Sequence, residues 1–249
     1  MYFQGFEKFL LTLNPTNIIL FFIFGALLCL FWLLFCLYLD RQAPEPKKQI
    51  LKVFFWGGFT VFPILLITGP ISSILDQVNW PSLAVQIFIF SFLIDGLFEE
   101  LAKYAVLSDK VYHSKYFDEP RDGLIYGMIV GLGFSFVENF LYSLICTDLK
   151  EGLQLILLRG LLTTSMHFLS GGIIGYYFGL AKFRNKKQLI LPGLIIAILF
   201  HGLYNTILRF GSDWTFIPLA ILLVGTYTFI ILGLRKIDKI FKKQPVQMV

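Results

Sequence analysis

Charged side chains interrupt the apolar segments of this sequence at a few points, and the densest group is FEELAKY at residues 98–104. It ends the run SLAVQIFIFSFLIDGLFEELAKY and places Glu99, Glu100 and Lys103 where a membrane helix is normally apolar. A charged residue at the centre of a membrane helix costs about 2.5–3.5 kcal/mol on insertion scales, so such residues usually face a cavity or one another. We therefore expect these side chains to point inward and to serve a chemical purpose.

Helical spacing sorts the charged residues of this segment. Asp95, Glu99 and Lys103 follow one another at intervals of four and form one stripe. Glu100 lies about 100° around the helix from Glu99, but it precedes Lys103 by three residues and can also reach it. Lys103 is expected to balance the charge and hold a carboxylate, with Asp95 in a supporting role.

Three later apolar segments carry polar residues as well: Glu138 and Asn139, Arg159 and His167, and His201 and Asn205. His201 and Asn205 share a helix face because they are four residues apart. Counting from the segment ends places Glu99, His167 and His201 near mid-bilayer and Glu138 nearer the outer leaflet. Polar faces turned toward one another would form one shared site, whereas the third histidine, His113, is expected in a solvated loop.

Carboxylates and histidines without an adjacent nucleophile suggest an activated water. A buried glutamate can act as general base, and a histidine and an asparagine can donate hydrogen bonds to an oxyanion. Alternatively, His167, His201 and either Glu99 or Glu100 could bind zinc and leave one position for water. No HExxH motif is present. Serine chemistry is less favoured, since none of the nearby serines lies in GxSxG: Ser135, Ser165 and Ser170.

Two other classes of protein remain open. A proton-coupled transporter also uses buried Glu and His, but it predicts inverted repeats or broken helices, and no repeat is visible. A non-catalytic scaffold or binder of prenylated proteins needs no cluster of charges across four segments.

The composition predicts an all-α, polytopic membrane bundle. Of 249 residues, 57% are hydrophobic and 15% charged, and the mean hydropathy is +0.74; soluble domains are about 25% charged. A helix needs about 20 apolar residues to cross a bilayer. Seven segments qualify: 17–39, 51–75, 82–108, 121–146, 153–182, 189–209 and 215–235. Residues 1–5 (MYFQG) resemble an expression-tag remnant, and 6–249 are expected to form a single membrane domain.

Successive connections between the predicted spans are alternately rich and poor in lysine and arginine. The first, third and fifth connections and the tail are rich in them, whereas the second, fourth and sixth have at most one each. The positive-inside rule places the rich connections and the C-terminus in the cytoplasm and the N-terminus outside, in a cell membrane. The net charge of +5 therefore reflects orientation in a lipid bilayer and not a nucleic-acid partner. The three cysteines lack metal-site spacing and are expected to be core residues.

Four blocks follow one another along the chain: DGLFEELAKY, YFDEPRDGLIYGMIVGLGFSFVENFLY, LLTTSMHFLSGGIIGYYFGLAKF and LFHGLYNTIL. They resemble the PrsW family of polytopic membrane proteases, and their order and spacing match it over nearly the whole chain after the first five residues. The family is more distantly similar to the CAAX prenyl endopeptidases. The resemblance implies an endopeptidase acting on a membrane-anchored protein or peptide, such as an anti-sigma factor cut at site 1.

The combined interpretation assigns catalytic roles to Glu99, Glu100, Glu138, His167, His201 and Asn205. Glu99 or Glu100 would activate water, and His201 with Asn205 would stabilise the oxyanion. Asn205 departs from the aspartate expected in the family, and an asparagine cannot be an anionic zinc ligand. This departure favours a glutamate-dependent mechanism without a cofactor, with zinc as the alternative.

Overall fold

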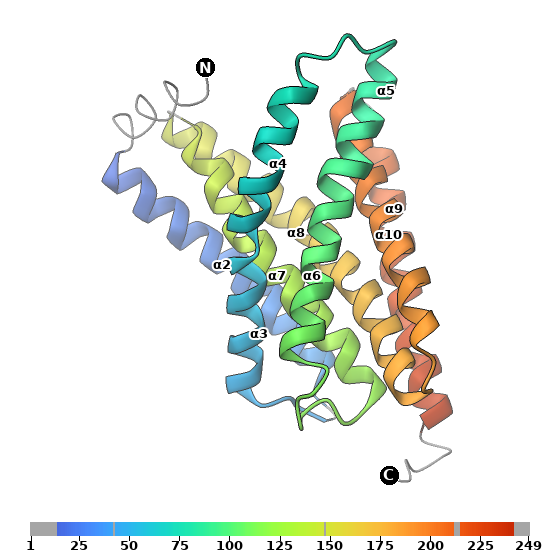
Figure 1. The fold of residues 1–249 in the computed structure, drawn as a ribbon. Coiled ribbons are helices and arrows are strands. Elements are labelled where there is room, and N and C mark those ends of the chain that lie inside the picture. Colours follow the sequence, from blue (N-terminus) through green and yellow to red (C-terminus); the bar gives the residue numbers. More distant parts are fainter. Residues whose placement is uncertain (1–13, 42, 147, 212–214, 242–249) are drawn as a thin grey trace.

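The computed structural model describes residues 14–41, 43–146, 148–211 and 215–241, and these form the helical bundle of Figure 1. The elements are α2 (Pro15–Leu39), α3 (Lys47–Phe59), α4 (Val61–Leu75), α5 (Leu83–Phe88), η1 (Ile89–Gly96), α6 (Leu97–Lys110), α7 (Pro120–Leu144), α8 (Leu149–Phe183), η2 (Lys187–Leu189), α9 (Ile190–Phe210) and α10 (Phe216–Phe241). No strand occurs in the described ranges, which confirms the all-α prediction. Residues 1–5, which were predicted to be a tag remnant, lie outside the described residues.

Six helical segments in the described part of the chain are long and apolar enough to cross a membrane: Pro15–Leu39, Lys47–Leu75, Pro120–Leu144, Leu149–Phe183, Lys187–Phe210 and Phe216–Arg235. They match six of the seven predicted spans. The seventh prediction, 82–108, corresponds to α5, η1 and α6, which follow one another without a break from Leu83 to Lys110. It carries four charged residues, Asp95, Glu99, Glu100 and Lys103, so burial inside the bundle must compensate for them.

A π-helical stretch, η1, lies in the middle of the segment Leu83–Lys110. It spans Ile89–Gly96 and contains Asp95. Its wider turn changes which residues share a face, so the predicted stripe from Asp95 to Lys103 does not act as one unit. Asp95 contacts α9, whereas Lys103 contacts Glu100 on its own helix. π-Helical turns are frequent at functional sites.

Helices α7 and α8 form the centre of the bundle, and Figure 1 shows α2 and α3 on one side of them and α9 and α10 on the other. Glycines let the two central backbones touch. A Cβ placed on Gly127 would lie 2.2 Å from the carbonyl oxygen of Gly171, and one on Gly131 would lie 2.0 Å from that of His167. Such close approach is typical of small-residue patterns in membrane helices, and it fixes His167 against α7.

Local sequence signals set where the two central helices begin. Glu119 and Asp122 form a capping box at the start of α7, with Pro120 in the first turn. Asp148 accepts a hydrogen bond from the Glu151 N–H and starts α8. On the opposite face of α7, Gly133 brings α3 equally close, since its Cβ would lie 2.0 Å from the Phe54 carbonyl oxygen.

A buried acidic contact joins the α2–α3 connection to the first turns of α7. The Glu45 N–H donates to Asp40 Oδ2 at 2.8 Å, and the Tyr126 hydroxyl donates to Glu45 Oε2. Arg121 donates to the carbonyl oxygen of Leu39. Burial raises the pKa of Glu45 to about 7, against the opposing effect of its hydrogen bonds.

We expect Gly127→Ala to destabilise the bundle by about 1–3 kcal/mol or more, because the added methyl group meets backbone that cannot move aside. Thermal unfolding of purified protein in detergent measures this. The matched control is Gly225→Ala in α10, where an added Cβ meets nothing within 4 Å. Equal unfolding temperatures for the two variants would contradict the close packing of α7 on α8.

The raised pKa of Glu45 predicts a pH dependence of stability. The folded protein holds this proton more tightly than the unfolded chain, whose reference pKa is 4.5. The stabilisation is therefore fully present below about pH 4.5 and is lost as the pH rises through about 7. As the pH rises through this range, the unfolding temperature should fall less steeply for Glu45→Gln, whose side chain carries no charge, than for wild type. A control substitution at the exposed Glu151, Glu151→Gln, should keep the wild-type slope; a Glu45→Gln profile parallel to wild type would exclude the effect.

Candidate functional site

A fully buried ion pair lies at the centre of the polar residues. Lys103 Nζ is 2.6 Å from Glu100 Oε1, and both side chains are 0% exposed. The same ammonium lies 2.8 Å from His167 Nδ1 and 3.0 Å from Ser170 Oγ on α8. An ammonium group has three hydrogens to donate, so these three acceptors satisfy it completely. The pair therefore joins α6 to α8 and fixes one carboxylate of the FEELAKY segment.

The partners of each histidine determine its tautomer. His201 Nδ1 lies 2.6 Å from Glu100 Oε1, which accepts, so Nδ1 carries the hydrogen and Nε2 has the free lone pair. His167 is arranged differently, because Lys103 can only donate to its Nδ1. His167 Nε2 therefore carries the hydrogen and donates to Glu138 Oε2 at 2.9 Å. The two rings are nearly perpendicular, with centroids 5.2 Å apart.

Glu138 is held by two partners from α8. Besides His167, Arg159 Nη2 lies 2.8 Å from Glu138 Oε2. The Arg159 Nε–H also donates to Asn139 Oδ1 at 2.8 Å, and its guanidinium lies 3.9 Å from the centroid of the Tyr142 ring. Residue counting placed Glu138 nearer the outer leaflet, but the close packing of α7 on α8 brings its long side chain to His167.

The two adjacent glutamates have different surroundings. Glu100 is held by Lys103, His201 and Ser170, which donates to it at 3.1 Å. Glu99 Oε2 and Glu100 Oε2 are both buried without a hydrogen-bond partner among the described residues, and His201 Nε2 lies 3.8 Å from Glu99 Oε2. Sequence spacing left the choice between the two open; only Glu99 lines the cavity and is not fixed by Lys103, so the geometry makes it the carboxylate available for coordination there.

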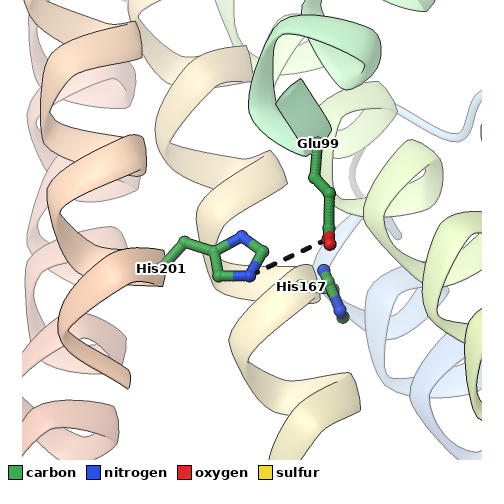
Figure 2. Close-up of side chains that lie close together, drawn as sticks. All are labelled: Glu99, His167 and His201. Carbon is green, nitrogen blue, oxygen red and sulfur yellow. Dashed lines mark ion pairs between the residues drawn. The ribbon is translucent and has the colours of Figure 1, made fainter. Parts of the chain in front are cut away.

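Figure 2 shows Glu99, His167 and His201 pointing toward one another from three helices. One carboxylate oxygen and one nitrogen from each ring lie within 4.8 Å of one another, a spacing that could hold a metal ion. The close approach of Gly96 to α9 brings His201 to α6, because a Cβ on Gly96 would lie 3.2 Å from the Ile198 carbonyl oxygen.

These three residues line a cavity of about 160 Å³. Its wall also contains Asn205, whose side-chain amide donates to Asp95 Oδ2 at 3.0 Å. Arg209 lies 2.7 Å from the same Asp95 oxygen and donates to Ser91 Oγ. Asp95 thus orients the amide of Asn205 on the cavity wall, and one amide hydrogen remains available.

The structure brings together the side chains proposed from the sequence: Asp95, Glu99, Glu100, Lys103, Glu138, His167, His201 and Asn205. Glu100 and Lys103 lie behind the cavity wall and not on it. Ser170 bonds to Glu100 and Ser135 bonds to Thr164, so neither is paired with a histidine ring as a serine nucleophile would be. His113 lies in the α6–α7 connection, away from the site.

Arg159 and Arg209 are the main residues of the site to which sequence analysis gave no role. Arg159 was visible as a charged residue in an apolar segment, a position that requires a counter-ion. Its partner, Glu138, lies on a different helix, so spacing alone could not identify the pair. Arg209 is the last residue of the predicted span 189–209, and its guanidinium extends back to Asp95.

Two kinds of hydrolytic chemistry fit this arrangement. The free Glu99 oxygen and the His201 Nε2 lone pair could coordinate a metal together with His167, with Glu100 accepting the other ring hydrogen of His201 as metal-ligating histidines usually require. Alternatively, Glu99 could accept a proton from water directly. Both chemistries need an inward-facing carboxylate beside two histidines in a closed cavity.

Comparison with known proteins gives a consistent result. The PrsW-protease family model, described as PrsW family intramembrane metalloprotease, matches residues 45–233. Protease PrsW of Bacillus subtilis is 36% identical over 203 residues, covering 80% of this chain and 86% of that protein. Protease PrsW of Oceanobacillus iheyensis is 35% identical over 195 residues, covering 77% and 85%. No solved structure matches the chain. The description of the family names a metalloprotease, whereas Asn205 favoured a mechanism without metal.

Replacing Lys103 alone should be strongly destabilising. Lys103→Met leaves the Glu100 charge buried without its partner, which typically costs about 3–5 kcal/mol. The double variant Glu100→Gln/Lys103→Met should regain much of this loss, because no net charge then remains in the pair. Thermal unfolding in detergent compares them with Lys110→Met, which removes a partly exposed ion pair with Asp109 and should cost at most about 1 kcal/mol. Wild-type stability of the Lys103→Met single variant would contradict the central role of the pair.

Proposed function

The chain belongs to the PrsW family of intramembrane proteases, and on that premise we propose that it cleaves membrane-anchored substrates at a metal site formed by Glu99, His167 and His201. Family membership favours a protease over the transporter and scaffold hypotheses. One observation carries the assignment of the site: one carboxylate oxygen and two ring nitrogens converge within 4.8 Å on the cavity that Glu99 lines.

The donor set fits a zinc ion. Glu99 Oε2 is buried without a hydrogen-bond partner, and His201 presents the Nε2 lone pair with Glu100 behind its other nitrogen. Both nitrogens of His167 have partners, so ligation there would displace Lys103 or Glu138 from the ring. A zinc ion at this position would polarise the scissile carbonyl and make a water molecule nucleophilic.

The remaining residues of the site position these groups and the substrate. Glu100 holds His201 in the tautomer that presents Nε2, and Arg159 holds Glu138 against His167. Asn205 has one amide hydrogen free on the cavity wall, where it could donate to the developing oxyanion. Burial excludes bulk water, which strengthens each of these interactions.

We place the cut on the outer side of the membrane. The cavity wall includes Tyr142, near the end of α7, and Arg209, near the end of α9. These helix ends adjoin the connections that are poor in Lys and Arg, which the positive-inside rule assigns to the outside, together with the N-terminus. Cleavage there matches the site-1 cut of a membrane-bound anti-sigma factor that the sequence resemblance implies. Residues 6–249 would then form one protease domain.

The decisive assay is cleavage of a tagged single-span reporter by purified protein in detergent. We expect Glu99→Gln to lose at least about 100-fold in rate, because it removes a ligand of the proposed metal site or, in the alternative mechanism, the general base. A chelator should abolish wild-type cleavage, and added zinc should restore it. The double variant Glu100→Gln/Lys103→Met, which leaves no unpaired charge in the pair, should retain cleavage at higher zinc, because loss of partners behind the ligands typically weakens metal affinity by about 10–100-fold.

The outcomes separate the two mechanisms. Cleavage that resists the chelator but requires Glu99 would replace the metal site with glutamate acting directly as general base. Full activity of Glu99→Gln would exclude both mechanisms.

A further inference from the structure

A second hollow lies beside the catalytic cavity, where α7 ends and α8 begins. It has a volume of about 500 Å³ and is lined by Tyr142, Ile145, Cys146, Glu151 and Leu155. Apart from Tyr142, these residues have no part in the site described above. Tyr142 borders both spaces, so the hollow adjoins the catalytic cavity.

Tyr142 forms a fixed wall between the two spaces. The Arg159 guanidinium lies 3.9 Å from the centroid of its ring, and Arg159 is itself held by Glu138 and Asn139. Arg159 also lines the catalytic cavity. A chain lying at the reactive groups therefore meets the Tyr142 ring as it leaves, and the next space available to it is the hollow.

The size of the catalytic cavity makes an additional binding space necessary. Pockets that enclose a whole ligand typically measure about 300–1,000 Å³, whereas the catalytic cavity measures about 160 Å³. It has room for the bond to be cut and little more. An extended chain advances about 3.3 Å per residue, so the residues that flank the bond must bind outside the catalytic cavity.

The lining of the hollow indicates which side chains it accepts. Tyr142, Ile145 and Leu155 present apolar surface, and Glu151 provides one carboxylate at the exposed rim. Burial, together with the nearby charge of Glu151, raises the pKa of the Cys146 thiol. An apolar surface beside a single negative charge suits an apolar side chain next to a lysine or arginine.

We propose that this hollow is a substrate subsite that binds an apolar residue and an adjacent basic residue on one side of the scissile bond. The proposal rests on the protease function and adds a sequence preference to it. A lipid acyl chain is the competing occupant, and it would need neither the carboxylate of Glu151 nor a position beside the catalytic cavity.

Cys146 provides a direct test of binding. It is partly exposed in the hollow, whereas Cys29 and Cys36 are buried, so a maleimide at mildly alkaline pH should label Cys146 selectively. The test uses Glu99→Gln protein, which should bind without cleaving, and acetylated octapeptides with Leu-Lys, Leu-Glu or Ser-Lys at the centre. We expect Leu-Lys to slow labelling at least fivefold and the other two peptides to have much smaller effects. Equal effects of all three peptides, or protection by added phospholipid alone, would overturn the proposal.

A charge reversal tests the same subsite during turnover. Glu151→Lys should raise KM for a Leu-Lys reporter about tenfold, lower KM for a Leu-Glu reporter, and leave kcat nearly unchanged. The matched control is Lys150→Glu, which changes the neighbouring exposed residue outside the hollow and should not alter this preference. Cleavage with an unchanged preference in Glu151→Lys would refute the subsite and leave the protease function intact. If wild type cleaves no reporter, the protease function fails and the labelling experiment still decides whether the hollow binds peptide.

Discussion

The buried ammonium of Lys103 is the interaction on which the rest of the site depends. It donates to Glu100 on its own helix and to His167 and Ser170 on α8, and the side chain is fully enclosed. A charge in such a place is tolerated only when every hydrogen finds an acceptor. Because Lys103 holds Glu100, Glu100 can hold His201, and the tautomer of each histidine follows. Glu99, one residue earlier, is left facing the cavity without a hydrogen-bond partner among the described residues.

Close backbone packing makes this arrangement rigid. Gly127 and Gly131 on α7 contact α8 directly, and Gly131 meets the backbone of His167 itself. Side chains of any size at these positions would separate the helices and move Glu138 away from His167. The geometry of the site therefore depends on these glycines as much as on the charged groups. It also depends on the close approach of Gly96 to α9, which positions His201.

Much of the fold and of the candidate site could be predicted from the sequence, because apolar length and helical spacing are local properties. The helical spans and the set of inward-facing polar residues follow from them. The division of roles between Glu99 and Glu100 does not, because it depends on which residue meets Lys103, His201 and Ser170 after packing. The π-helical turn before α6, which separates Asp95 from the stripe, left no recognisable spacing signal. The pairing of Arg159 with Glu138 joins two helices, so spacing within one helix could not reveal it.

The most direct test of the central claim is the amount of zinc bound by purified protein, measured by elemental analysis after equilibration with a low concentration of free metal. The account predicts one zinc per chain for wild type and loss of that zinc in both Glu99→Gln and His201→Ala. Glu151→Gln, an exposed substitution away from the three ligands, should keep it. Wild-type zinc content in the Glu99→Gln and His201→Ala variants would contradict the proposed site.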